Sequence, residues 1–413
     1  MGTQDANRNG SSGLAGIVVS DSSISYVDGS AGILEYRGYD IRLLAEQSSF
    51  DEVTFLLWNG RLPAAGELAE SRACAAEGRE VPSAILASLG GVPKTATPMA
   101  VMRTMVSQLA LYDPDSEDSS PKAFRRKAYR LLGQIAVVLA AFERLRRGRY
   151  PIEPRADLDH TANFLWMLTG EEPQPAATKA LDQYLLLLAE HELNASTFAA
   201  RVTTSTEADL HSAITSALGT LKGPLHGRAV EGAMLQFMEI DSVEDVEPWF
   251  RSIRGQGRKV MGMGHRVYKV RDPRAAPLMR NLETMVDATG QRRWYDIART
   301  LETVALQDPY FRERNLSANV DFYSAPLLYS LGISVDAFTC LFAMSRIAGW
   351  AAHVWEQQEN NRLIRPLANY TGEHQRPWPT LYERDEAAQL VFSFGWPATP
   401  AAPRSAPRVL ARR

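Results

Sequence analysis

The sequence predicts a mainly α-helical protein of two domains, with a small β-ribbon near its N-terminus. Helical spacing of apolar residues recurs along most of the 413-residue chain, whereas the alternating pattern of strands occurs only near residues 17–36. This length exceeds what one hydrophobic core usually organises, so we expect two domains. The sequence contains no internal repeat and no phosphate-binding Gly-x-x-x-x-Gly-Lys-Ser/Thr loop.

The ends of the chain and its first helix have distinct signals. Residues 1–12 are polar, rich in glycine and serine, and without the apolar stretch of a signal peptide, so we expect a disordered leader. After the strand pattern, Ser49 and Glu52 form a capping box before an apolar run, which Gly60 ends. Residues 397–413 are rich in proline, which cannot sustain a helix, and they predict a flexible tail.

Between these ends, apolar residues recur at helical spacing, interrupted by one loop. Residues 109–122 are rich in Asp, Ser and Pro and predict a surface loop. The most apolar segment, 338–355, is broken by Arg346 and His353. It therefore predicts a buried helix and not a membrane span, which needs about 18 to 20 uninterrupted apolar residues. The remaining helical patterns cover residues 99–111, 124–146, 162–169, 176–192, 207–221, 228–238 and 275–288.

Composition narrows the classes of protein that the sequence fits. The net charge of −3 and the isoelectric point near 6.2 give no basic field for nucleic acid. Cys74 and Cys340 are too few for a disulfide framework, and this scarcity favours the reducing cytoplasm. Both thiols are interpreted as buried apolar side chains. We therefore expect a cytoplasmic protein that binds neither nucleic acid nor a membrane.

A glycine-containing stretch with a histidine and an arginine is the strongest sign of a binding site. It reads Gly262-Met-Gly-His-Arg-Val-Tyr-Lys-Val-Arg-Asp-Pro-Arg274. Gly262 and Gly264 allow backbone conformations and close approaches that a side chain would forbid. Asp272 can cap a helix that begins at the following proline, which places Arg274 in the first turn, where free amides and the helix dipole favour anions. The stretch predicts a site for a carboxylate or phosphate, with His265 in the same pocket.

Other segments place a polar side chain in apolar surroundings. A leucine-rich helix runs into His191, which a core position would also explain. His226 stands between a Gly-Pro turn and another glycine, so a rigid turn would aim its ring. Asp321 precedes an apolar run, where desolvation would raise the basicity of its carboxylate. Arg346, inside the segment 338–355, needs a bound anion or a buried ion pair.

Taken together, these segments resemble the citrate synthase family. Its Gly-x-Gly-His-x-Val…Asp-Pro-Arg signature matches residues 262–274, its Gly-Pro-Leu-His-Gly segment matches 223–227, and its Asn-Val-Asp segment matches 319–321. The opening β-ribbon of the family, followed by a Tyr-Arg-Gly-Tyr turn, resembles residues 16–39. Its later arginine segments resemble residues 344–350 and 363–366, so the resemblance extends from about residue 14 to about residue 370.

The resemblance implies a helical fold of two domains with the active site in the cleft between them. The large domain would comprise residues 14–223 and 325–396, and the small domain, residues 224–324, would be inserted between these parts. A leader over residues 1–13 and a tail over residues 397–413 would flank the two domains. The N-terminus has no room for the extra β-domain of the larger, NADH-inhibited hexameric type, which favours a homodimer.

The resemblance also implies a reaction of the tricarboxylic acid cycle, in which acetyl-CoA, oxaloacetate and water give citrate and CoA. Asp321 would be the base that takes a methyl proton from acetyl-CoA, and His226 would donate a hydrogen bond to the thioester oxygen. His265 would polarise the ketone of oxaloacetate. The reaction of the family requires no metal and no permanently bound cofactor, because acetyl-CoA is a co-substrate.

Oxaloacetate carries two carboxylates, for which arginines are natural bidentate partners. By resemblance, His191, Arg274 and Arg346 would bind it. The neighbouring subunit would contribute Arg365, although a surface charge also explains that residue. CoA would bind along Arg258, Lys259, Val260, Met261, Gly262, Met263 and Gly264. Met263 departs from the family, which more often has an aromatic or small residue there, and we expect it to change the packing against CoA.

Three other functions fit parts of the sequence. A 2-methylcitrate synthase uses propionyl-CoA with the same catalytic residues, and one extra methylene is worth only about 1 to 3 kcal/mol of discrimination. A metal-dependent hydrolase would use His191, His226, His265 and Asp321 as ligands, but the second histidine of His-Glu-x-x-His is missing. A non-catalytic helical scaffold would have no need of these polar residues. The remaining histidines, at positions 160, 211, 353 and 374, are interpreted as structural or exposed.

Overall fold

The computed structural model describes residues 12–14 and 16–380, and its elements confirm a mainly α-helical fold with a small N-terminal ribbon. The chain divides into two units, Met1–Ile364 and Arg365–Arg413. All described helices and strands belong to the first unit. The described residues of the second unit, 365–380, contain neither helix nor strand. Residues 1–11 of the expected leader and the expected tail, 397–413, lie outside the described residues.

The elements of the first unit follow in chain order. The strands are β1 (Ser25–Asp28), β2 (Ile33–Tyr36) and β3 (Tyr39–Asp40), and short 3₁₀ turns cover Ser12–Leu14, Ala110–Tyr112, Val243–Asp245 and Val335–Ala337. The helices are α1 (Ile41–Gln47), α2 (Phe50–Asn59), α3 (Ala65–Glu77), α4 (Ser83–Gly90), α5 (Pro98–Leu109), α6 (Pro121–Arg146), α7 (His160–Thr169), α8 (Pro175–Leu188), α9 (Ala195–Thr204), α10 (Leu210–Leu221), α11 (Ala229–Phe237), α12 (Val246–Gly255), α13 (Ala275–Thr289), α14 (Arg293–Gln307), α15 (Pro309–Glu313), α16 (Val320–Ser330) and α17 (Phe338–Glu359).

Several local predictions are confirmed. In α2, the Ser49 hydroxyl accepts a hydrogen bond from the Glu52 N–H (3.3 Å), and the Glu52 carboxylate accepts one from the Ser49 N–H (2.9 Å). Gly60 ends that helix with a left-handed φ of 75°. The apolar segment 338–355 lies within the buried helix α17. In the described part of the chain, no helix combines the length and apolar character that crossing a membrane requires.

Two predicted element bounds need correction. The pattern over residues 17–36 suggested an early strand, but β1 begins at Ser25, and the preceding described residues pair with no strand of the described sheet. The helix predicted over residues 176–192 ends at Leu188. It ends there because Asn194 caps α9 by accepting a hydrogen bond from the Thr197 N–H, and because Glu192 takes a left-handed φ of 55°.

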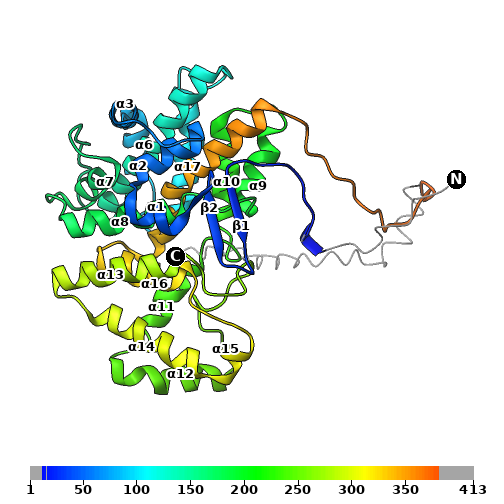
Figure 1. The fold of residues 1–413 in the computed structure, drawn as a ribbon. Coiled ribbons are helices and arrows are strands. Elements are labelled where there is room, and N and C mark those ends of the chain that lie inside the picture. Colours follow the sequence, from blue (N-terminus) through cyan, green and yellow to red (C-terminus); the bar gives the residue numbers. More distant parts are fainter. Residues whose placement is uncertain (1–11, 15, 381–413) are drawn as a thin grey trace, which may run out of the picture. The chain divides into compact units, whose positions relative to one another are not determined.

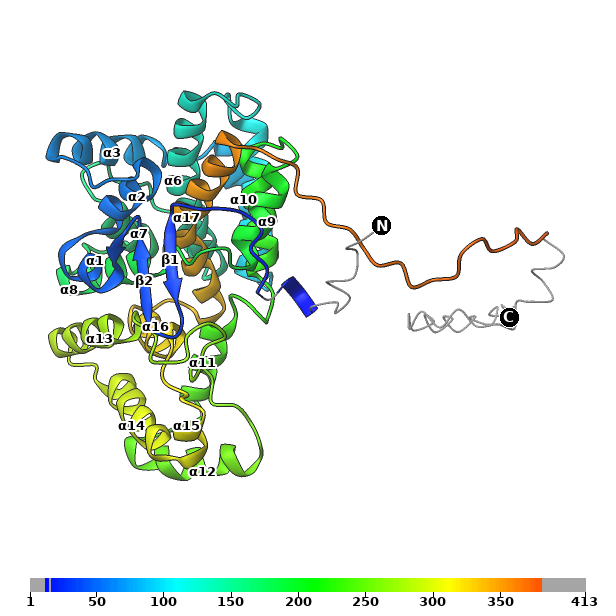
Figure 2. The same ribbon diagram turned by 45° about the vertical axis from the view of Figure 1, so that its right-hand side comes forward.

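The helix α17 is the centre of the first unit. It packs against α2, α6, α8, α9 and α10, and nearly all of its side chains are buried. Figures 1 and 2 show α11 to α16, which come from residues 229–330, below this layer. Of these, α13 packs against α8, and α16 packs against both α11 and α13. The segment 229–330 is therefore attached to the rest of the unit mainly along α8.

The C-terminal end of α8 is bonded directly to α17 and to the ribbon. A helix leaves its last carbonyl groups without internal partners. Here the Leu188 carbonyl accepts a hydrogen bond from the Arg346 Nε (2.8 Å), and the Ala189 carbonyl accepts one from the Gly349 N–H (3.2 Å). The Tyr36 hydroxyl lies 2.9 Å from the Glu190 carbonyl oxygen. Because a Cβ at Gly349 would lie 2.4 Å from the Ala189 oxygen, this close approach requires glycine.

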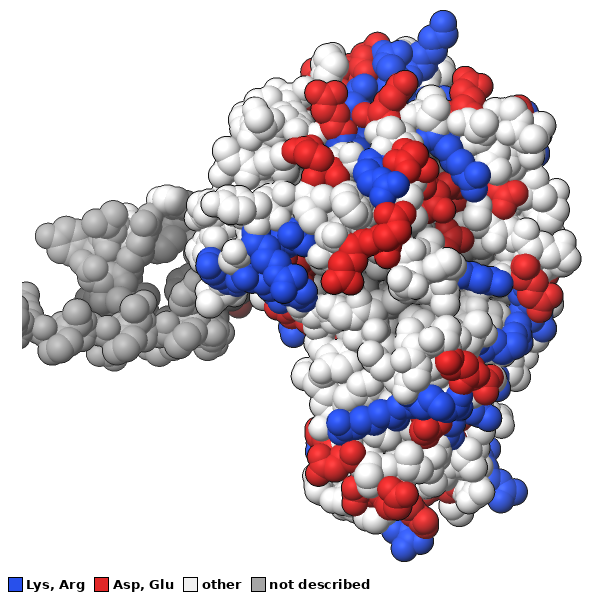
Figure 3. Space-filling model, turned by 90° about the vertical axis from the view of Figure 1, so that its left-hand side faces the viewer, with Lys and Arg blue, Asp and Glu red and all other residues white. Residues whose placement is uncertain are grey.

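Charges of both signs are interspersed over the surface that Figure 3 shows. Many exposed charges of the first unit are paired, as in the salt bridges of Arg280 with Glu46 (3.4 Å) and of Arg61 with Glu67 (2.5 Å). Exposed pairs of this kind contribute little to stability, because water screens them. On this face, patches of basic residues alternate with acidic ones and form no continuous basic field.

Candidate active site

The structure brings together four of the side chains around the glycine-containing stretch and the end of α8. The ring centroids of His191 and His265 are 5.6 Å apart, and both rings contact Tyr268, at 5.6 and 4.9 Å. The His191 Nε2 lies 3.1 Å from the Tyr268 hydroxyl, and the Arg274 guanidinium lies 5.9 Å from the Tyr268 ring centre. The sequence analysis gave Tyr268 no role of its own. Its contact with His191 joins residues that are far apart in the chain, so the sequence could not show it.

The glycine-containing loop is fastened to the segment that leads into α16. The Gly262 carbonyl accepts a hydrogen bond from the Asn319 N–H (2.9 Å), and the Gly264 carbonyl accepts one from the Asn319 side chain (2.7 Å). Both glycines have left-handed φ angles, of 78° and 86°. A Cβ at Gly262 would lie 2.8 Å from the Cα of Phe322, so the loop can approach α16 only without a side chain. Two motifs that are 55 residues apart thus become neighbours.

The backbone fixes the tautomer of His265. Its Nδ1 accepts hydrogen bonds from the N–H groups of Val267 (3.0 Å) and Tyr268 (3.2 Å). In the neutral ring the proton therefore resides on Nε2, which becomes a hydrogen-bond donor. Burial, and the nearby charge of Arg274, lower the pKa of His265 to about 4, so the ring is neutral at pH 7. His265 can offer one N–H to a ligand without carrying a charge.

Arg274 and Asp272 form a buried ion pair beside the start of α13. The helix begins at Ala275 and not at the proline, so Arg274 precedes it. The Asp272 carboxylate accepts a hydrogen bond from the Arg274 N–H (3.0 Å), as a capping side chain does, and further ones from the Nε (3.0 Å) and Nη2 (2.8 Å) of Arg274. It also accepts one from the Val320 N–H (3.2 Å). Burial raises the pKa of Asp272, but Arg274 outweighs this effect and holds it below its usual range. The Nη1 of Arg274 makes no hydrogen bond among the described residues.

Arg346 is a buried guanidinium that forms no ion pair with any residue that the structure describes. The side chain is 1% exposed and lies in the middle of α17, with its Cζ 4.8 Å from the Phe342 ring centre. Its Nε donates to the Leu188 carbonyl, but its buried Nη1 has no hydrogen-bond partner among the described residues. Burial lowers the pKa of Arg346 to about 10. The charge of Glu190 opposes this shift, and the Nη1 of Arg346 remains available to a ligand.

His226 is held from one side only. Its Nε2 lies 2.9 Å from the Ser196 hydroxyl, which also accepts a hydrogen bond from the Trp350 indole (3.2 Å). The Nδ1 of His226 makes no hydrogen bond to described residues, so it is the nitrogen that a ligand can reach. Burial, with a contribution from the charge of Arg346, lowers the pKa of His226 to about 4. Ser196 and Trp350 are further residues of the site that the sequence did not reveal, because their contacts are tertiary.

Asp321 is in the first turn of α16, and its carboxylate has no hydrogen-bond partner in the described structure. Its N–H is satisfied by the Asn319 side chain (2.9 Å), which caps the helix. Burial raises the pKa of Asp321 to about 6, although the charge of Arg274 opposes this shift. The side chain remains partly exposed, so a ligand can reach it. A carboxylate in this state is ionised at pH 7 and is more basic than usual.

The other predicted residues lie in two places. Arg258 and Lys259 are exposed, and Arg258 pairs with Glu239 (2.9 Å). The following residues up to Gly264 run beside α11, where the Met261 N–H donates to the Gln236 side chain (2.8 Å). Arg365 is the first residue of the second unit.

The ribbon supports the loop that carries His265. The Lys269 N–H donates a hydrogen bond to the Gly29 carbonyl (2.8 Å), which lies in the turn between β1 and β2. A Cβ at Gly29 would lie 2.2 Å from the Val267 oxygen. Since the Val267 N–H is one of the two donors to the His265 Nδ1, the turn and the orientation of the ring are coupled.

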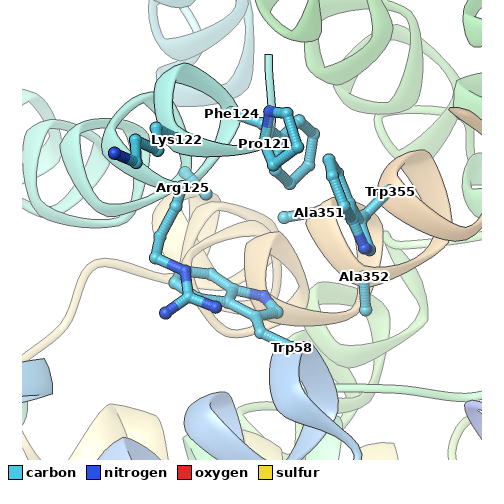
Figure 4. A pocket seen from close by; sticks show the side chains of 9 residues that line it. Trp58, Pro121, Lys122, Phe124, Arg125, Ala351, Ala352 and Trp355 are labelled. Atoms are coloured by element: carbon cyan, nitrogen blue, oxygen red, sulfur yellow. The ribbon is translucent and has the colours of Figure 1, made fainter. Parts of the chain in front are cut away.

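A separate cavity of about 300 Å³ lies between α2, α6 and α17 (Figure 4). Trp58, Phe124 and Trp355 form its apolar walls, and Lys122 and Arg125 also line it. It contains neither a histidine nor a carboxylate, so it lacks a group for proton transfer at neutral pH. In the part of the chain that is described, no group of three or more His, Cys, Asp or Glu side chains is arranged to hold a metal ion.

Comparisons with known proteins agree on one family. A family model described as citrate synthase, C-terminal domain, matches residues 13–367. Citrate synthase 2 of Bacillus subtilis is 44% identical over 373 residues, which cover 90% of this chain and 98% of that protein. A 2-methylcitrate synthase of Mycobacterium tuberculosis is 41% identical over 367 residues, covering 89% and 92%. The ternary complex of citrate synthase from Thermoplasma acidophilum with carboxymethyl coenzyme A and oxaloacetate has a TM-score of 0.83 at 31% identity, covering 89% of this chain and 98% of that one.

We predict that Gly29→Ala lowers catalysis while the protein stays folded. The added methyl group would displace the Val267 carbonyl and, with it, the backbone donors that orient His265. A displacement of about 1 Å at a reacting group can cost about a hundredfold in rate, so we expect kcat to fall by at least about tenfold. Steady-state kinetics with circular dichroism as a check of folding would measure this effect. Ser30→Ala, in the same turn, is the matched control, and equal activities of both variants would contradict the coupling.

Proposed function

The chain belongs to the citrate synthase family, and on this premise we propose how its residues condense an acyl-CoA with oxaloacetate. The protein is an enzyme of the citrate synthase type, which converts acetyl-CoA, oxaloacetate and water to citrate and CoA. One combination of groups supports the assignment of roles. The Nη1 of the buried Arg346 lacks a partner among the described residues, His265 is neutral, and the pKa of Asp321 is raised.

Enolisation is the first step. The Asp321 carboxylate removes a methyl proton from acetyl-CoA, for which its pKa of about 6 makes it both ionised and basic at neutral pH. The enol oxygen needs a donor in the same step, and His226 supplies it through Nδ1, because Ser196 occupies Nε2. The Ser196 hydroxyl has two acceptors within reach, the His226 Nε2 (2.9 Å) and the Asn194 Oδ1 (2.8 Å), and this assignment requires that its one proton is donated to Nε2.

Condensation is the second step. The Nε2–H of His265 donates to the ketone oxygen of oxaloacetate, which gains negative charge as the enol carbon attacks the carbonyl carbon. Arg274 through Nη1, Arg346 and His191 hold the two carboxylates. The former ketone oxygen takes up one proton, which balances the proton that Asp321 removed, and the new carbon–carbon bond gives a thioester of citrate with CoA. Water then attacks the thioester carbonyl, the carbon–sulfur bond breaks, and citrate and the free thiol of CoA leave.

CoA binds along the segment from Arg258 to Gly264, beside α11. Residues 224–324 act as a small domain that closes over the bound substrates against residues 14–223 and 325–396, because the enol must be shielded from water. A change in the small-angle scattering profile upon addition of oxaloacetate is the measurement of closure.

The chain acts as a homodimer in the cytoplasm, with Arg365 completing the site of the neighbouring subunit. Restored activity in mixtures of Arg365→Ala with Asp321→Ala subunits is the measurement of that contribution.

Propionyl-CoA is the second candidate substrate, because a 2-methylcitrate synthase is 41% identical to this chain. We predict oxaloacetate-dependent release of free CoA thiol from acetyl-CoA, and a lower kcat/KM with propionyl-CoA. A pocket discriminates one methylene by about 1 to 3 kcal/mol, which corresponds to a ratio of about 10 to 200. A thiol-reactive dye would measure release for both thioesters, with EDTA present throughout. A higher kcat/KM with propionyl-CoA would instead assign the 2-methylcitrate reaction, and no release with either thioester would contradict the proposed function.

Replacement of the proposed base gives a second prediction. Asp321→Ala should lower kcat by at least about a thousandfold, because alanine has no group that can take the methyl proton. Binding of oxaloacetate, measured by calorimetry, should change by less than about threefold, since Asp321 does not hold that substrate in our assignment. Near-normal turnover of the variant would show that another group is the base.

The pH dependence follows from the pKa of the same carboxyl. The reaction needs ionised Asp321, and its pKa is raised to about 6, so activity should be constant above that pH and decline as the pH falls through it. Well below pH 6, kcat/KM should fall about tenfold per pH unit. His226 and His265, with pKa values of about 4, stay neutral over this range and add no second decline above pH 5. A midpoint near pH 4, typical of an ordinary carboxyl, would argue against a buried Asp321 as the base.

A further inference from the structure

A buried chain of ionisable side chains lies behind the substrate residues and takes no part in the proposed chemistry. The His353 Nδ1 lies 3.1 Å from the Arg201 Nη1, and the His353 Nε2 lies 2.9 Å from the Glu190 Oε1. The same nitrogen of Arg201 donates to the Glu356 carboxylate (2.7 Å). His353 and Glu190 are both fully buried, and Arg201 is 4% exposed. The chain extends across α9, α17 and the end of α8.

The direction of each hydrogen bond in this chain is determined. A guanidinium has only donors, so the His353 Nδ1 must accept from Arg201. With Nδ1 as an acceptor, the ring proton on Nε2 is donated to Glu190. Burial raises the pKa of Glu190, but His353 and the charge of Arg346 outweigh this effect and hold it below its usual range, so the carboxylate is ionised. His353 thus links a cation and an anion through one hydrogen bond on each side of its ring.

Glu190 connects this chain to the substrate site because it directly precedes His191. Its Oε1 also accepts a hydrogen bond from the Ser25 hydroxyl (3.1 Å), and that hydroxyl accepts one from the Glu192 N–H (3.1 Å). The residues on both sides of His191 are therefore fixed by the same group of side chains. Glu192 has a left-handed φ of 55°. This backbone conformation is unfavourable for residues other than glycine and persists only where the surrounding structure imposes it.

We propose that His353 and Glu190 are positioning residues for oxaloacetate: they hold the segment 190–192 so that the His191 ring faces the substrate. Two consequences distinguish this role from a general contribution to stability. Loss of the bridge should weaken the binding of oxaloacetate far more than that of acyl-CoA, since only His191 depends on this segment. A side chain that keeps both hydrogen bonds should restore the affinity. The inference rests on the proposed role of His191 as a substrate ligand.

Glutamine is such a side chain, because its amide oxygen can accept from Arg201 and its amide nitrogen can donate to Glu190. Leucine has a similar size but offers neither group. Hydrogen bonds to charged groups contribute enough that losing one typically costs about ten- to a hundredfold in affinity. We therefore expect His353→Leu to raise the KM for oxaloacetate at least about tenfold, with the KM for acetyl-CoA within about twofold of wild type. His353→Gln should recover most of the loss.

The matched control is His160→Leu, which replaces another buried histidine. His160 packs against Phe50, with ring centroids 5.4 Å apart, and its Nε2 has no hydrogen-bond partner in the described structure. This control should lower the melting temperature at most and leave both KM values unchanged. Ser25→Ala is the variant to use if His353→Leu does not fold, because it removes one partly exposed hydroxyl and should raise the KM for oxaloacetate in the same direction by a smaller factor.

The experiment measures both KM values and, by calorimetry, the direct affinity for oxaloacetate of each folded variant. The inference is supported if His353→Leu loses oxaloacetate affinity selectively and His353→Gln regains it. It is overturned if the folded His353→Leu or Ser25→Ala variant binds oxaloacetate like wild type, or if the glutamine variant is as weak as the leucine variant. Failure of the proposed function itself has a different signature, because the wild-type protein would then show no oxaloacetate-dependent release of CoA.

Discussion

The site depends on two buried arginines whose charges are stabilised while some of their N–H donors stay available to a ligand. Arg274 pairs with Asp272 through only one side of its guanidinium, and Arg346 has a backbone carbonyl as its one hydrogen-bond acceptor in the described structure. Burying a charge is costly unless it is compensated, and both arginines keep donors available for a ligand. Their charges also help to lower the pKa values of His226 and His265, so the cations that we propose as ligands of the anionic substrate also keep the neighbouring imidazoles neutral.

The remaining architecture holds these charges in place by direct backbone contact. Helix α17 lies against the end of α8 at Gly349, and the glycine-containing loop lies against α16 at Gly262. At both positions a side chain would overlap with the neighbouring backbone, so the contact uses hydrogen bonds of the main chain. Main-chain contacts of this kind leave little freedom for the side chains beside them, and proximity catalysis requires such restriction.

Much of the fold was predictable from sequence because helices and caps are encoded locally. The capping box at Ser49, the helix containing Arg346 and the grouping of Gly262, Gly264 and His265 all depend on residues close together in the chain. The sequence placed the start of the helix after Asp272 at the proline, whereas α13 begins at Ala275, and the spacing did not reveal that the Asp272 carboxylate also pairs with the Arg274 guanidinium. Ser196 and Tyr268 were missed for the same reason: each contacts a histidine from another part of the fold.

The neutrality of the site histidines limits how the enzyme can respond to acid. With His226 and His265 uncharged down to low pH, Asp321 is the one proposed catalytic group whose proton occupancy varies near neutrality. One titrating group gives a shallow, graded response, because cooperativity requires several coupled protons. Acidification would therefore reduce the rate of the reaction gradually and reversibly. It would not produce the abrupt transition that clusters of titrating histidines produce in pH sensors.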